Sequence, residues 1–265
     1  MISSKLGGRW FCLIGPHMID PMSSFQVKNI LPMSVLGFDI SLTNSSIFML
    51  LVVAAICGVF WLATRDSGIV PTKLQVVMEK LFFLVGGIVK SNAGKKGVEI
   101  FPYMIALFLF IMLGNVVGLF PFAFSYTSQI CITIGMALMV FLASIIIGLI
   151  NQGAGYFKRF CPSGIPGYLV PFFIIIELLS FLFRPISLGI RLFANMVSGH
   201  IMIEVIAGFA ASIAGVAVFS YFSAVPVAVN VALNLFKFVV CMLQAYVFVV
   251  LSCMYLSESL EPQAH

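Results

Sequence analysis

Three ionisable residues, Glu177, Arg184 and Arg191, are spaced seven apart in an otherwise apolar stretch of the chain. On a helix, where successive residues are about 100° apart, they share one face within about 40°. Four further polar residues fall near the same line: Ser180, Ser187, Asn195 and Ser198. An ionisable group at the centre of a bilayer costs about 3 kcal/mol or more, so such groups usually line an ion or proton route. In a membrane helix, this spacing predicts such a route along this face.

A second set of titratable residues lies further along the same stretch, where His200 and Glu204 are four residues apart. They face another side of the predicted helix, and histidine titrates near neutral pH, which suits proton relay. The last apolar stretch places polar residues on one helical face, at 4, 7, 11 and 14 positions after Asn230: Asn234, Lys237, Cys241 and Gln244. We therefore expect two helices with polar faces to pack as a hairpin around the route.

The elements that position these residues must be membrane helices. The chain has 265 residues, of which 62% are hydrophobic and 9% charged, and its mean hydropathy is +1.16. A soluble domain has about 25% charged residues, so that class is excluded. Uncharged stretches long enough to cross a bilayer are 100–157, 205–236 and 238–257. Because lipid cannot hydrogen-bond a bare backbone, we expect an all-α integral membrane fold.

Basic residues gather in two connections between apolar stretches. One holds Arg65, Lys73, Lys80, Lys90, Lys95 and Lys96, and the other holds Lys158 and Arg159. The positive-inside rule places both connections on the inner side of the membrane and the N-terminus outside. The net charge of +5 is thereby explained by topology, and no nucleic-acid partner is expected.

We expect one membrane domain with five parts. These are an outer-side N-terminal segment (1–45), a first span (46–64), an interfacial amphipathic helix (72–90), a transmembrane helical hairpin (100–151) and a pair of long, strongly tilted helices (168–257). As a helix, 169–209 would be about 60 Å long, twice the roughly 30 Å of a bilayer core. It must be tilted or broken, with Pro185 and Gly189 as possible bends, and we expect the tilt. The N-terminal segment lacks a clean apolar core before a cleavage site, so we treat it as part of the mature chain.

The cysteines and histidines indicate no metal or redox centre. None of the six cysteines forms a CxxC pair, and most of them lie in apolar runs. We interpret them as small core residues. The three histidines do not cluster, and we expect neither a metal nor another cofactor.

Three motifs resemble one family. The segment from Arg184 to His200, RPISLGIRLFANMVSGH, is similar to the signature RPxSLxxRLxxNMxxGH of subunit a, the proton-channel subunit of F-type ATP synthases. GNVVGLFP at 114–121, followed by YTSQ at 126–129, and QAYVF at 244–248 resemble two further blocks of that family. The resemblance covers 115–256; the first span and the surface helix agree with the layout of the family without diagnostic residues.

The resemblance implies a function for each matched residue. Arg191 would be the proton gate, facing the carboxylate of each passing subunit c, and Arg184 and Ser187 would support it on the same stripe. The half-channel residues would be Asn115, Glu177, Asn195, His200 and Gln244, with Glu177 toward the inner side. The face periodicity adds Glu204, Asn234 and Lys237 to this proton path.

The resemblance also implies partners and a location. They are the subunit c ring, the peripheral-stalk and other membrane-sector subunits, the lipid bilayer and protons. The chain would catalyse nothing by itself, because ATP chemistry would occur elsewhere in the complex. A histidine at 200 resembles mitochondrial and related bacterial members, so we expect the mitochondrial inner membrane, with a bacterial plasma membrane as the alternative.

One position departs from the pattern of the family. Lys237 stands where the mitochondrial type has a glutamate that pairs with the histidine of the inlet channel. Either burial depresses the pKa of this lysine so that it relays protons, or Glu204 supplies the missing carboxylate and pairs with Lys237. We favour the relocated glutamate.

Two other function classes remain open at this point. A subunit of a respiratory proton pump would also carry lysines and glutamates in membrane helices, and it would copurify with a redox enzyme. A transporter could bind an anionic solute at Arg191 and would be stabilised by that solute. The sequence shows no paired inverted halves to support a transporter.

Overall fold

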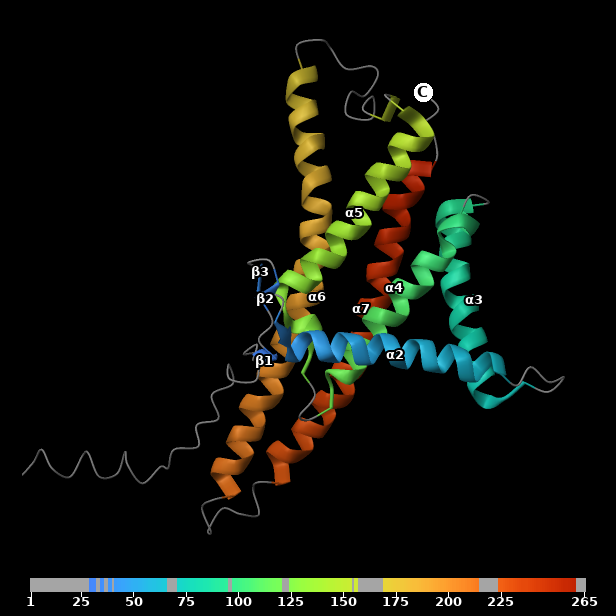
Figure 1. The fold of residues 1–265 in the computed structure, drawn as a ribbon. Coiled ribbons are helices and arrows are strands. Elements are labelled where there is room, and N and C mark those ends of the chain that lie inside the picture. Colours follow the sequence, from blue (N-terminus) through green and yellow to red (C-terminus); the bar gives the residue numbers. More distant parts are fainter. Residues whose placement is uncertain are drawn as a thin grey trace, which may run out of the picture. The chain divides into compact units, whose positions relative to one another are not determined.

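The computed structural model describes residues 29–31, 34–35, 38–39, 41–65, 71–94, 97–120, 124–153, 155–156, 169–214 and 224–260. Six α-helices (α2 to α7), one short 3-10 helix (η3) and four short strands are found among them (Figure 1). The chain forms two compact units. The larger unit comprises Val27–Val197 and Lys237–His265, and the smaller comprises Met1–Gln26 and Ser198–Phe236.

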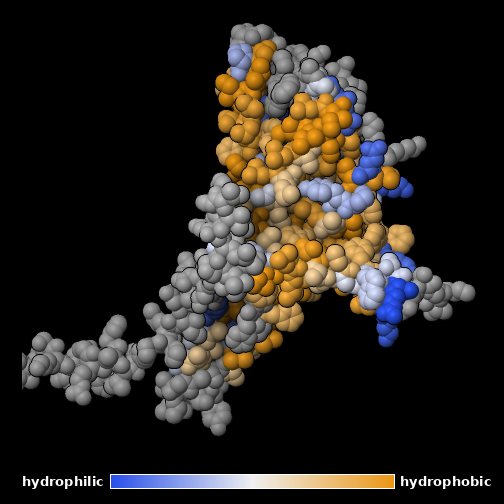
Figure 2. Space-filling view, in the orientation of Figure 1, coloured by the Kyte–Doolittle hydropathy of each residue, from blue (hydrophilic) through white to orange (hydrophobic). Residues whose placement is uncertain are grey.

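Five helices are long and apolar enough to cross a membrane, and the predicted all-α membrane class is confirmed. They are α2 (Asn44–Arg65), α4 (Gly97–Val117), α5 (Ile130–Gln152), α6 (Val170–Ala214) and α7 (Ala224–Leu260). Apolar side chains cover most of the face shown in Figure 2. In a bilayer, such a surface is solvated by lipid.

Four short strands before α2 were not predicted. β1 (Asn29–Leu31) pairs with β4 (Leu42–Thr43), and β2 (Ser34–Val35) pairs with β3 (Phe38–Asp39), both antiparallel. This gives one antiparallel pair nested inside another, directly before α2.

Helices α2, α3 (Lys73–Ala93) and α4 pack against one another (Figure 1). The hydroxyl of Thr72 caps α3 by accepting a hydrogen bond from the backbone N–H of Gln75 at 3.3 Å. Of the apolar residues expected on one face of 72–90, Met78, Val85 and Ile88 are buried, whereas Leu74 is 38% exposed. Lys95 and Lys96, which follow α3, lie outside the described residues.

The turn between α4 and α5 contains η3 (Tyr126–Ser128). The predicted break at Pro121 lies outside the described residues, as do Lys158 and Arg159 at the predicted exit from α5. Helix α5 ends at Gln152, with Gly153 at a φ of 57° as its cap.

Helix α6 is continuous over 45 residues, including Pro185. A helix of this length extends about 68 Å. The broken-helix alternative is therefore wrong, whereas the tilt stays a prediction. Helix α7 has 37 residues and continues to Leu260, beyond the expected end at 256–257.

The core of the larger unit draws on five helices. Val85 of α3, Met104 of α4, Val140 of α5, Leu192 of α6 and Phe248 of α7 all belong to it and are at most 1% exposed. The part of α6 that carries Arg191 is therefore held in place by packing.

Candidate functional site

Arg191 lies exposed on α6. The helix packs on α5 through Gly189, where a Cβ would lie 3.0 Å from the Cα of Ile134. Arg191 is about 160° around the helix from Gly189, so it points away from α5. Its neighbours Ile186 and Ile190 are 39% and 44% exposed. No described residue forms an ion pair or hydrogen bond with Arg191, which leaves a cation on an apolar surface.

Three of the predicted path residues come together from three helices of the larger unit. Asn195 Nδ2 donates to Gln244 Oε1 at 2.8 Å. Asn115 Nδ2 donates to the backbone oxygen of Cys241, one turn before Gln244, at 3.4 Å. Asn115 and Gln244 are 0% and 5% exposed. Asn115 Oδ1 and Gln244 Nε2 are buried and have no hydrogen-bond partner among the described residues.

The glycines of the 114–121 block have a packing function that explains the motif. A Cβ at Gly114 would lie 2.0 Å from Tyr126 Oη, and one at Gly118 would lie 2.7 Å from Ser125 Oγ. The Tyr126 hydroxyl donates to the backbone oxygen of Phe110 at 2.8 Å. Burial raises the pKa of this phenol, so it stays protonated as the donor. The turn thus locks onto α4 beside Asn115.

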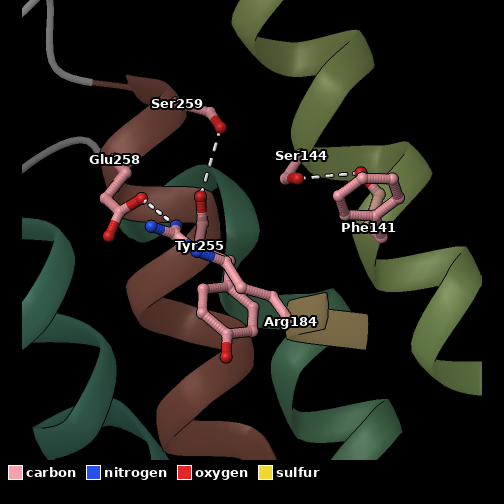
Figure 3. A network of polar contacts seen from close by, with 6 residues as sticks. All are labelled: Phe141, Ser144, Arg184, Tyr255, Glu258 and Ser259. Carbon is pink, nitrogen blue, oxygen red and sulfur yellow. Dashed lines mark hydrogen bonds and ion pairs between the residues drawn. The ribbon is translucent and has the colours of Figure 1, made fainter. Parts of the chain in front are cut away.

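Arg184 occupies a different environment from Arg191. Its Nη1 lies 2.5 Å from Glu258 Oε2 near the end of α7 (Figure 3). Its guanidinium carbon is 5.4 Å from the centre of the Tyr255 ring and 5.9 Å from that of Phe181. The side chains of Arg184 and Glu258 are 24% and 35% exposed. Arg184 is therefore an anchor between α6 and α7.

The last turn of α7 also bonds to two other helices. Ser257 Oγ donates to the backbone oxygen of Asn92 on α3 at 2.6 Å. Gln152 Nε2 of α5 donates to the backbone oxygen of Ser259 at 3.1 Å. Together with the ion pair of Glu258, these contacts connect α3, α5 and α6 to one turn. They also explain why α7 continues past the predicted end.

Glu177 and Ser187 complete the predicted stripe on α6. Glu177 is half-buried and Ser187 is exposed. Glu177 has no ion pair or hydrogen bond to a described residue. The structure does not bring it to the cluster of Asn115, Asn195 and Gln244.

His200, Glu204 and Asn234 belong to the smaller unit. His200 and Glu204 lie one turn apart on α6 and are half-buried. One carboxylate oxygen of Glu204 is buried without a hydrogen-bond partner among the described residues. Asn234 donates to the backbone oxygen of Asn230 at 3.1 Å.

Lys237 belongs to the larger unit, where it is 6% exposed. Cys241 and Gln244 follow on the same face of α7 and are also buried. The predicted inward face of α7 is thus present for these three residues. The pairing of Lys237 with Glu204 stays a prediction.

Glu258 was missed because the expected helix ended before it. The available signal was an acid at the end of the last apolar stretch, three residues after Tyr255. The cysteines at 57, 131, 241 and 253 are free thiols, whereas Cys12 and Cys161 lie outside the described residues. No group of three His, Cys, Asp or Glu side chains in the described part of the chain is placed to hold a metal ion.

Comparison with known proteins adds an independent observation. The sequence model of the family described as ATP synthase A chain matches residues 46–257. ATP synthase subunit a of Chelativorans sp. (strain BNC1) is 43% identical over 92% of this chain and 98% of its own. ATP synthase subunit a 1 of Brucella anthropi is 43% identical and subunit a of Brucella canis is 42% identical, each over 92% of this chain and 98% of its own length.

Proposed function

Because the chain belongs to the ATP synthase A chain family, we propose that it conducts protons through two half-channels beside the c ring of an F-type ATP synthase. The family membership supports the role of a proton-translocating subunit. The exposed cation on an apolar helix face supports a site that acts on a partner in the membrane.

The observation that carries the proposal is the exposed Arg191, whose charge is not neutralised by an ion pair with a described residue. A guanidinium does not deprotonate in proteins, so it cannot relay a proton. Its charge lowers the pKa of a carboxyl group that approaches it. A protonated carboxyl on the ring would release its proton on reaching Arg191, and direct transfer between the half-channels would be blocked.

The inlet half-channel would run through polar side chains on α4, α6 and α7. Asn195 is hydrogen-bonded to Gln244, and Asn115 is hydrogen-bonded to the backbone of Cys241, one turn before Gln244. Buried amide atoms of Asn115 and Gln244 are available to water or to a passing group. His200 and Asn234 would extend this path. Protonation of the ring would be driven by about 2.3 kcal/mol per charge for each 100 mV across the membrane.

Glu177 would lie on the outlet half-channel, supported by its half-buried carboxylate without a described partner. In the inlet, Glu204 would replace the glutamate that the family has at the position of Lys237. The buried, unbonded carboxylate oxygen of Glu204 supports this assignment. Proton flux that is unchanged in Glu204→Gln would refute it.

The partners would be the c ring, the peripheral stalk and other membrane-sector subunits, with ATP chemistry elsewhere in the complex. The relatives compared above are bacterial, which favours a bacterial plasma membrane over the mitochondrial inner membrane. Five apolar helices are consistent with a multi-pass protein in either membrane.

The test is ATP-driven proton pumping and passive proton leak in vesicles that carry the complex with Arg191→Ala. We expect pumping to be lost while passive conduction is retained. Arg65→Ala is the matched control, because Arg65 is an exposed arginine at the end of α2. Pumping that is unchanged in Arg191→Ala would remove Arg191 from the mechanism.

A further inference from the structure

A groove of about 500 Å³ lies between α3 and α4 in the larger unit, away from the residues of the proposed proton path. It is lined by Gly86, Val89, Lys90, Gly94, Val98 and Phe101. Its volume falls within the roughly 300–1,000 Å³ of known ligand pockets. Neither the motifs of the sequence nor the family comparison assigns a function to it.

The walls of the groove are apolar because Val89, Val98 and Phe101 form them, and two further positions are glycines. A Cβ at Gly94 would meet no atom within 4 Å, and one at Gly86 would meet Phe101 Cε2 at 3.6 Å. Val98 is 75% exposed at the rim. The walls of the groove therefore consist of hydrocarbon side chains and glycine backbone, a surface against which a flexible acyl chain can pack.

Lys90 is the charged residue that lines the groove in the described part of the chain, and it is exposed and has no ion pair among the described residues. Two acids lie on the adjoining elements. Glu79 accepts a hydrogen bond from Gln75 at 3.0 Å, and Glu99 is exposed but does not line the groove. The groove therefore combines an apolar wall with a positive charge.

The groove also lies where polar and apolar surfaces meet. Figure 2 shows hydrophilic atoms gathered at the right-hand edge, at the level where α3 ends and α4 begins, next to the apolar surface. At such a boundary the head group of a lipid and the start of its acyl chain are at the same depth. Basic pockets between membrane helices bind anionic head groups.

We propose that this groove binds an anionic diacyl phospholipid, with its phosphate at Lys90 and an acyl chain against Val98 and Phe101. A helix of another subunit is the competing occupant. A stable protein interface buries about 1,000 Å² or more, whereas a groove of about 500 Å³ has the size of a small-ligand pocket. The size of the groove and the charge of Lys90 thus match one amphiphile.

The test uses the whole complex in phosphatidylcholine vesicles that contain phosphatidylglycerol with a photoactivatable acyl chain. We expect the label on the peptide that contains Val98 and Phe101. Lys90→Gln should reduce labelling about fivefold, the contribution of one basic side chain near an anionic lipid. Gly86→Leu, which fills the groove, should abolish it.

Two matched variants provide the controls. Lys80→Gln removes an exposed charge from the same helix outside the groove. Gly87→Leu adds the same side chain where a Cβ would meet nothing within 4 Å. Both should label as the unaltered protein does, at equal amounts of assembled complex.

Three outcomes would overturn the proposal. The first is a loss of label in Lys80→Gln equal to that in Lys90→Gln. The second is a label that Gly86→Leu leaves unchanged. The third is a label from photoactivatable phosphatidylcholine that is as strong as that from phosphatidylglycerol and that Lys90→Gln does not reduce. A photoreactive side chain at position 98 that crosslinks to another subunit instead of lipid would assign the groove to a helix. Proton pumping is measured in parallel, so a failure of this proposal is separable from a failure of the proton-path proposal.

Discussion

Two arginines seven residues apart on α6 have opposite environments. Arg184 is paired with Glu258 and lies over aromatic rings, whereas Arg191 is exposed, has no ion pair with a described residue and has Tyr255 within electrostatic range. A guanidinium that is neutralised within its own chain contributes to packing. One that is left available on a membrane-facing surface can act on a charge that arrives from outside.

The sharpest test of this comparison exchanges each arginine for lysine. We expect Arg191→Lys to lower coupled proton pumping by about tenfold or more, because a partly desolvated lysine loses charge more readily and lacks the planar donor fork. Arg184→Lys retains a charge opposite Glu258 and should keep most of the pumping. Equal losses in the two variants would show that the difference in environment has no functional meaning.

Removal of the partner of Arg184 should affect stability first. Glu258→Gln leaves a half-buried guanidinium unpaired, and we expect a loss of about 2 kcal/mol, between the values for exposed and buried pairs. Thermal unfolding of the purified complex measures it. In a double-mutant cycle with Arg184→Gln, a coupling energy near zero would contradict the ion pair.

The direction in which Arg191 points depends on Gly189. Gly189→Ala brings a Cβ within 3.0 Å of the Cα of Ile134 and 3.1 Å of the backbone oxygen of Thr133. We expect α6 to shift and the protein to lose about 1 kcal/mol, with a partial loss of pumping. Gly208→Ala on the same helix, where a Cβ meets nothing within 4 Å, should change neither property.

The smallest effect is expected at the turn that supports Asn115. Tyr126→Phe removes the hydrogen bond to Phe110, and we expect a loss of about 0.5–1 kcal/mol. Both arginine environments should be unaffected, so pumping should remain.

This variant should also change the dependence of stability on pH. The pKa of Tyr126 is raised in the folded protein, so the unfolded chain loses its proton first and stability falls above the ordinary tyrosine pKa of about 10. Thermal unfolding between about pH 8 and pH 11 should show a shallower fall in Tyr126→Phe. An identical slope in both proteins would contradict the protonated donor.

The helical membrane fold could be predicted because uncharged length and basic connections are properties of the local sequence. The inward face of α7 could also be predicted, since Lys237, Cys241 and Gln244 follow helical spacing. The strands at 29–43 could not, because pairs of two or three residues carry too little hydrophobic pattern.

The different environments of the two arginines could not be predicted from the sequence either. Helical spacing places Arg184 and Arg191 on one stripe, but it does not show which part of the stripe another helix covers. The partner of Arg184 is 74 residues away, and the contact of Gly189 with α5 depends on how the two helices pack. Long-range packing decides both.

The last turn of α7 has a consequence for the order in which the protein is made. The bonds of Ser257, Glu258 and Ser259 to α3, α6 and α5 cannot form until α7 has been synthesised. Helices α3, α5 and α6 therefore lack these contacts until α7 has been made. A chain that ends before Ser257 would lack all three of these bonds, which connect α7 to α3, α5 and α6.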